Sequence, residues 1–149
     1  MTTTLPIVIE TFIHATPQRI WQVLTKKEEM KHWYFNLSDF KPETGFEFSF
    51  WGENEGRRYL HLCVVQEVLV NKKLSYTWSY EGYSGTSLVT FELFEENQLT
   101  RVVLTHSGLE TFTDQHPDFA AENFKTGWTY LVHKALKEYS ETGTVVSAE

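Results

Sequence analysis

The sequence has little of what would stabilise a secreted or membrane protein. It contains one cysteine, Cys63, so it cannot form an intramolecular disulfide or a thiolate metal cluster. The N-terminal stretch, residues 1–6, lacks the basic and apolar regions of a signal peptide. No apolar run approaches the roughly 20 residues that span a bilayer. We therefore expect a soluble cytoplasmic protein without membrane insertion.

Positive charge is also scarce. Lys and Arg number 13 against 20 Asp and Glu, which gives a net charge of −7 and a pI near 5.4. Proteins that bind nucleic acid or anionic membranes present a basic face, so neither partner is expected. Aromatic residues, at 15%, are abundant. The length predicts one domain over residues 1–149, with a core from about 7 to 140 and a frayed tail at 143–149.

The last stretch of the chain, Asp118 to about Thr142, predicts a long amphipathic helix with Asp118 as its N-cap. At 1.5 Å per residue this helix would run roughly 35 Å. Apolar residues recur on it at intervals of mostly three and four: Phe119, Ala121, Phe124, Trp128, Leu131, Val132, Ala135, Leu136 and Tyr139. One face of this helix should therefore pack against the rest of the protein.

Most of the preceding chain alternates with period two, which predicts strands. The exceptions are two short helices after the first strand, Ile7 to Ile13: the first begins at Thr16-Pro17, and the second ends near Trp33. The facing of residues 57–70 stays open because apolar residues occur at both parities. The inward face of the sheet should carry Phe46, Phe48, Phe50, Leu74, Tyr76, Trp78, Tyr80, Val89, Phe91, Leu93, Val102, Leu104 and His106.

A sheet of about six strands is much wider than one helix of about 10 Å, so the sheet must curl around the helix. Bulky aromatic side chains on such a curled sheet tend to leave space that they do not fill. Tyr and Trp add polar tips to an apolar wall, a composition typical of small-molecule pockets. The sequence thus predicts an α+β fold, with a curved antiparallel sheet of six to seven strands, a long C-terminal helix and a cavity between them.

The chain resembles the activator-of-heat-shock-chaperone-ATPase homologues (AHSA-like), within the START-like, helix-grip or SRPBCC superfamily. The resemblance covers about Ile7 to Tyr139, through the order and spacing of several short stretches. They are Thr16–Thr25, His32-Trp33, Gly45–Phe48, Leu74–Trp78, Ser87–Leu93, Thr100–Gly108 and Gly127–Leu131. It implies a seven-stranded sheet gripping the helix, closed at one end by the two short helices.

Members of this superfamily are similar in fold but differ in activity. They include binders of hydrophobic molecules, some cyclases or hydrolases, stress-resistance proteins and co-chaperones. The co-chaperones also have a separate N-terminal domain, whereas this chain begins at the first strand, so a chaperone partner has the weakest support. The resemblance supplies no catalytic residue that could be transferred, and monomer and homodimer both stay open.

We therefore expect a non-catalytic binder of a hydrophobic, aromatic or lipid-like molecule, with no cofactor and no metal. The residues expected to line its cavity are Trp33, Phe48, Phe50, Tyr59, His61, Tyr76, Trp78, Tyr80, Phe91, His106, Trp128 and Leu131. The alternatives are a cyclase- or hydrolase-like enzyme using His106 or His61 as acid–base, and an interaction module with an apolar patch at Leu88, Val103 and Phe94. Gly127 suggests that a strand or ligand approaches the helix closely.

Overall fold

In the computed structural model the described residues are 6–54, 56–112 and 121–144. Six strands form one sheet: β1 (Ile7–Ile13), β2 (Glu47–Asn54), β3 (Arg57–Leu69), β4 (Lys73–Tyr80), β5 (Ser87–Glu96) and β6 (Leu99–Ser107). The helical elements are α1 (Pro17–Thr25), α2 (Lys27–Trp33), the 3₁₀ turn η1 (Leu109–Phe112), α3 (Ala121–Tyr130), the π-helix η3 (Leu131–Leu136) and α4 (Lys137–Thr142). None of the helices in these ranges is both long and apolar enough to cross a membrane.

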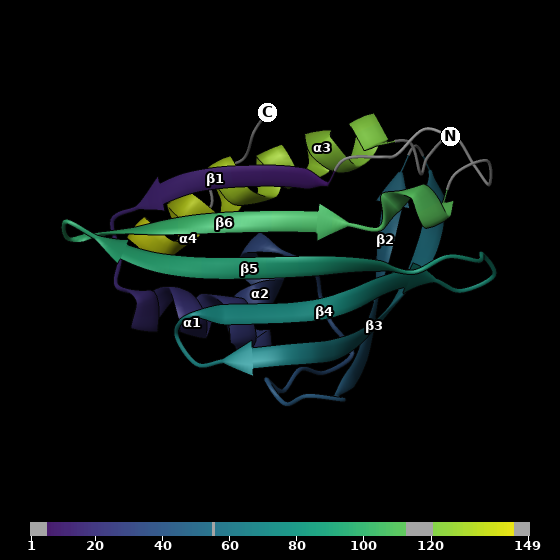
Figure 1. Cartoon of the computed structure of the whole chain (residues 1–149), viewed down its shortest axis with the longest axis horizontal. Helices are drawn as coiled ribbons and strands as arrows, with labels where there is room; N and C mark the ends of the chain where they lie inside the picture. The colour runs from purple at the N-terminus through teal and green to yellow at the C-terminus, as the bar shows by residue number, and fades with distance from the viewer. Residues whose placement is uncertain (1–5, 55, 113–120, 145–149) are drawn as a thin grey trace.

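The sheet is antiparallel throughout, in the order β1-β6-β5-β4-β3-β2. The first strand closes one edge by pairing with the last, and the meander from β2 to β6 supplies the rest. Figure 1 shows the sheet as one layer with α1, α2 and α4 behind it and α3 along the edge formed by β1, while β2 and β3 turn steeply around one end. This α+β helix-grip architecture confirms the predicted fold. The seventh strand implied by the resemblance is not found among the described residues.

The face of the sheet on which each strand residue lies follows from the alternation of buried and more exposed positions along the strands. The predicted inward residues are buried, except for Phe46, which is half-buried. In β3, Tyr59, His61, Cys63 and Val65 point inward, and a register shift between Val65 and Glu67 ends the alternation. Its outward positions are also apolar, with Leu62 39% exposed, which is why the sequence pattern left this strand ambiguous.

The sequence pattern predicted one long α-helix at the C-terminus, and the structure differs from this prediction in one segment. From Ala121 to Thr142 the helix is continuous, but its middle third, η3, is a π-helix. Buried residues recur every four positions, at Phe124, Trp128, Val132, Leu136 and Ser140. In an α-helix a four-residue period drifts by about 40° per step, and the wider π turns offset this drift. The predicted N-cap Asp118 and the tail after residue 144 lie outside the described ranges.

Two short helices close one end of the grip. Thr16 caps α1 by accepting a hydrogen bond from the backbone N–H of Arg19, and Pro17 occupies the first turn, as predicted. The Arg19 guanidinium then pairs with both carboxylate oxygens of Glu29 in α2. The Tyr139 hydroxyl of α4 donates to the same carboxylate. These three side chains, called the clasp below, fasten the short helices to the end of the long one.

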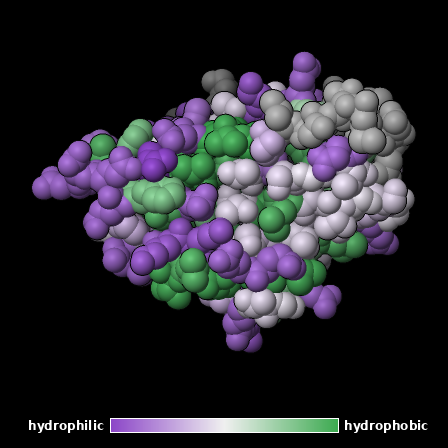
Figure 2. All heavy atoms as spheres, viewed as in Figure 1, coloured by the Kyte–Doolittle hydropathy of each residue, from purple (hydrophilic) through white to green (hydrophobic). Residues whose placement is uncertain are grey.

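The outer face of the sheet, toward the viewer in Figure 2, mixes apolar and polar side chains. Leu88 and Phe94 are exposed there, and Val103 is half-buried. The Arg101 guanidinium lies 4.4 Å from the centroid of the Phe94 ring and pairs with Glu10 and Glu96. The apolar patch predicted for an interaction module is therefore interrupted by a network of charges.

Replacing Tyr139 by Phe removes one hydrogen bond from the clasp while keeping the ring. We expect Tyr139→Phe to lower the free energy of unfolding by about 1 kcal/mol, because Glu29 keeps Arg19 as its partner. Tyr130→Phe, at an exposed site on the same helix, is the control. Equal effects of the two substitutions in urea denaturation would contradict the role of the clasp.

Candidate functional site: a cavity between sheet and helix

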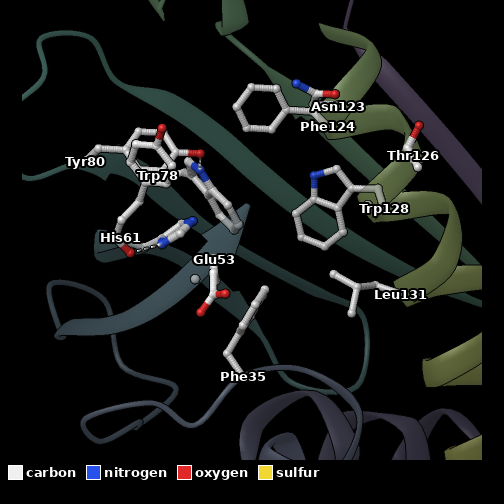
Figure 3. A pocket seen from close by; sticks show the side chains of 13 residues that line it. Phe35, Glu53, His61, Trp78, Tyr80, Asn123, Phe124, Thr126, Trp128 and Leu131 are labelled. Atoms are coloured by element: carbon white, nitrogen blue, oxygen red, sulfur yellow. Dashed lines mark hydrogen bonds between the residues drawn. The ribbon is translucent and has the colours of Figure 1, made fainter. Parts of the chain in front are cut away.

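A cavity of about 340 Å³ lies between the curled end of the sheet and α3, and it opens to solvent. Figure 3 shows His61, Trp78 and Tyr80 on the sheet side, Trp128 and Leu131 on the helix side, and Phe35 below them. The complete wall is Phe35, Gly52, Glu53, Tyr59, His61, Trp78, Tyr80, Asn123, Phe124, Thr126, Gly127, Trp128 and Leu131. The space is therefore bounded mainly by aromatic rings, with a few polar groups among them.

Two glycines shape this cavity in different ways. A Cβ atom on Gly52 would lie 2.6 Å from Cε1 of His61, so β2 can pass over the imidazole only without a side chain at this position. A Cβ atom on Gly127 would meet nothing within 4 Å. No strand therefore approaches Gly127 closely. The other alternative that the sequence suggested, that a ligand approaches the helix at Gly127, stays a prediction.

His61 is part of the aromatic wall. Its ring stacks on Phe50, with 4.4 Å between centroids and 15° between planes, and meets Trp78 and Tyr80 edge-on. Its Nδ1 lies 3.1 Å from the carbonyl oxygen of Tyr59, to which Nδ1 donates when it carries the ring proton. Burial lowers the pKa of His61 to about 4. At neutral pH this side chain is therefore uncharged and a weak base.

His106 joins the helix to the sheet. The Trp128 indole N–H donates to its Nδ1 at 2.9 Å, so the ring proton is on Nε2, which donates to Ser87 Oγ at 2.7 Å. The Ser87 hydroxyl in turn donates to the carbonyl oxygen of Trp78 at 3.0 Å. Burial lowers the pKa of His106 to about 3. His106 does not line the cavity, and both its ring nitrogens are used in holding Trp128 against the sheet.

The Tyr80 phenol of the wall is neutral. The Trp78 indole N–H donates to the Tyr80 hydroxyl at 2.8 Å, and burial raises the pKa of Tyr80 far above its ordinary value. Tyr76 lies deeper in the protein, where its hydroxyl is 2.7 Å from that of Tyr34. The hydrogen bonds of Trp78 and Trp128 fix both indoles, so this part of the wall is preorganised.

The cavity collects half of the residues predicted to line it: Tyr59, His61, Trp78, Tyr80, Trp128 and Leu131. Four of the others, Phe50, Tyr76, Phe91 and His106, are buried behind the wall. Trp33 borders a second hollow of about 390 Å³, which shares Phe35, Gly127 and Leu131 with the first, and Phe48 borders a separate groove over β2 to β4. Contact of any of them with a ligand stays a prediction.

Seven wall residues were not predicted as such: Phe35, Gly52, Glu53, Asn123, Phe124, Thr126 and Gly127. Phe124 had been noted only as part of the helical stripe, whereas Gly127 had been singled out as a position that a strand or ligand approaches closely. Gly52 and Glu53 belong to the stretch Gly52-Glu-Asn-Glu-Gly56, whose composition predicts a turn, although β2 continues to Asn54. Phe35 follows α2 in a stretch with no periodic pattern, so no sequence signal pointed to it.

A family model described as "Activator of Hsp90 ATPase homolog 1-like protein" matches residues 14–141. Similar solved structures include protein MLL2253 from Mesorhizobium loti (28% identity, TM-score 0.72, 90% of this chain and 95% of that one). Another is BH1534 from Bacillus halodurans (29%, 0.68, 89% and 94%). The Aha1 dimer from Colwellia psychrerythraea is similar in fold (22%, 0.70, 94% and 98%). None of the curated proteins compared with the chain matches it.

Ser87→Ala tests the link between helix and sheet. It leaves the buried Nε2–H of His106 without its acceptor, so we expect the free energy of unfolding to fall by about 1–3 kcal/mol. Ser79→Ala is the matched control, because the Ser79 hydroxyl donates to the carbonyl of Leu62 outside the core. Chemical denaturation of both variants measures the difference. A loss no larger than that of the control would contradict the role given to His106.

The two buried histidines also predict a pH dependence. Both are neutral in the folded protein down to about pH 4, whereas unfolding returns them to ordinary values near 6.5. Between these limits the unfolded state binds more protons, so stability falls as the pH is lowered. The fall reaches up to about 1.4 kcal/mol per pH unit for each histidine.

We expect His61→Phe to remove about half of this dependence between pH 6 and 5, with the phenyl ring keeping the stack on Phe50. The exposed His14→Gln serves as control, and urea denaturation at each pH measures the slope. A slope in His61→Phe equal to that of the wild type would show that His61 is not neutral in the folded protein.

Proposed function

The chain belongs to the family of activator of Hsp90 ATPase homolog 1-like proteins, and we propose that it binds a small hydrophobic or aromatic molecule in the cavity of Figure 3. The observation that carries this proposal is a solvent-accessible space of about 340 Å³ with a mainly aromatic wall. Ligand pockets of proteins usually measure about 300–1,000 Å³ and combine apolar walls with a few polar groups. The phenols of Tyr59 and Tyr80 supply such groups here.

The rigidity of the wall supports binding. Trp78 and Trp128 each use their indole N–H in a buried hydrogen bond, so each ring is held in one orientation before any ligand binds. A wall that is already ordered loses little conformational entropy when it captures a molecule. The cavity can therefore contribute binding free energy mainly through burial of apolar surface.

The geometry favours binding over acid–base catalysis by a histidine. An acid–base enzyme at this site needs a titratable group whose pKa lies near the working pH. His61 has a pKa of about 4, and His106 lies behind the wall with both nitrogens engaged. An interaction module has weaker support, because Arg101 and its two carboxylate partners interrupt the outer patch. A role in stress response stays a prediction from the resemblance.

Titration with N-phenyl-1-naphthylamine, a neutral probe that fluoresces in apolar surroundings, tests the proposal. Gly127→Leu places a side chain in the open space beside the helix and should weaken probe binding at least tenfold. Gly127→Ala adds little volume and is the matched control. It should bind the probe like the wild type while stabilising the protein by about 1 kcal/mol, because alanine is the better helix former.

Native mass spectrometry of the purified protein complements the titration, since a retained mass of small-molecule size would identify the natural ligand. If the wild type does not bind the probe and retains no such mass, the binding function is wrong. Equal probe affinities of Gly127→Leu and Gly127→Ala would show that binding takes place elsewhere on the molecule.

A further inference from the structure

The cavity wall carries charge of one sign. Among the described lining residues, Glu53 is the one with a charged side chain, and no Lys or Arg contributes to the wall. In Figure 3 the Glu53 side chain lies between those of His61 and Phe35. The carboxylate makes no ion pair with the part of the chain that the structure describes. Among the described residues of the wall, a ligand would therefore meet one negative charge, that of Glu53, which is exposed to solvent.

The cationic side chain opposite Glu53, that of Arg58, stacks on an aromatic ring. Arg58 pairs with Glu53 across the β2–β3 ladder, but its guanidinium lies 4.6 Å from the centroid of the exposed Trp51 ring. This stack places Arg58 outside the wall of the cavity. Arg58 and Glu53 form no ion pair among the described residues, so the exposed Glu53 carboxylate is open to a molecule that enters.

The rest of the wall also suits a cation. The faces of aromatic rings carry partial negative charge and attract ammonium groups, with Trp the strongest and Tyr and Phe next. The cavity has two Trp, two Tyr and two Phe in its wall: Trp78, Trp128, Tyr59, Tyr80, Phe35 and Phe124. His61 is the remaining ring, and its low pKa keeps it uncharged at neutral pH, so it does not repel a cation.

An anion would be disfavoured at the same place. The lining residues that the structure describes offer a carboxylate no cationic partner, and Glu53 would repel it. The whole chain adds to this effect, because its net charge of −7 attracts cations and repels anions over distances of about the Debye length, roughly 10 Å at 0.1 M salt.

We infer that the cavity selects organic cations, in which an ammonium group is carried on an aromatic or other apolar body, over anions of the same shape. This inference rests on the proposed binding function and narrows its ligand class. The apolar body would pack between the sheet and α3, and the ammonium group would lie at Glu53 near the opening.

Two naphthalene derivatives of similar size test this selectivity at pH 7: 1-naphthylmethylamine, which is an ammonium ion, and 1-naphthoate, a carboxylate. Each is titrated as a competitor of N-phenyl-1-naphthylamine. We expect the ammonium compound to bind at least tenfold more tightly than the carboxylate. In Glu53→Gln this ratio should fall at least threefold. In Glu47→Gln, which removes an exposed charge from the same strand outside the cavity, it should stay unchanged.

The neutral probe separates the two ideas. If it binds but the two naphthalene derivatives compete equally, the cation selectivity is wrong while the binding function stands. A ratio that falls equally in Glu53→Gln and Glu47→Gln would assign the preference to the overall charge of the protein, and would also overturn the role of Glu53. Failure of the probe and of both competitors to bind would remove the binding function itself.

Discussion

The hydrogen-bonded chain from Trp128 through His106 and Ser87 to the backbone of Trp78 fixes the distance between helix and sheet. Each donor in it has one acceptor, and the proton of the imidazole must be on Nε2. Because the chain is fully satisfied, a histidine can be buried at the centre of the protein without a charge. The wall of the cavity depends on this link, because the link holds the Trp128 indole directly and ends at the backbone carbonyl of Trp78.

The fold was predictable because its signals are periodic. Alternation along β4, β5 and β6 identified the inward residues, the stripe on the last helix identified its covering face, and the family resemblance is confirmed by the family model. The site was predictable only in part. Residues such as Trp78 and Tyr80 follow from strand parity, but parity does not tell whether an inward side chain faces a space or lies beneath the helix, as His106 does.

There are physical reasons why the sequence pattern did not predict the remaining wall residues. Phe35 is placed by an irregular segment, and Asn123 and Thr126 are exposed residues on the polar side of the helical stripe. Glu53 lies at the end of a strand that runs further than its turn-like composition indicated. The charge that distinguishes the cavity is thus supplied by a residue that binary patterning assigns to solvent. The effect of this charge on a ligand depends on the neutral aromatic rings around it, and only the three-dimensional structure shows these neighbours.

The π-helix divides the long helix into two parts that contact different regions of the protein. Residues before it face the cavity, and residues after it reach the clasp at Glu29. The wider π turns hold one residue more than regular α-helix would over the same rotation. Deleting a single residue between Leu131 and Leu136 would therefore restore regular α-helix while the later side chains kept nearly the same direction. The helix can thus present one face to the cavity and, beyond the π turns, still direct Tyr139 toward Glu29.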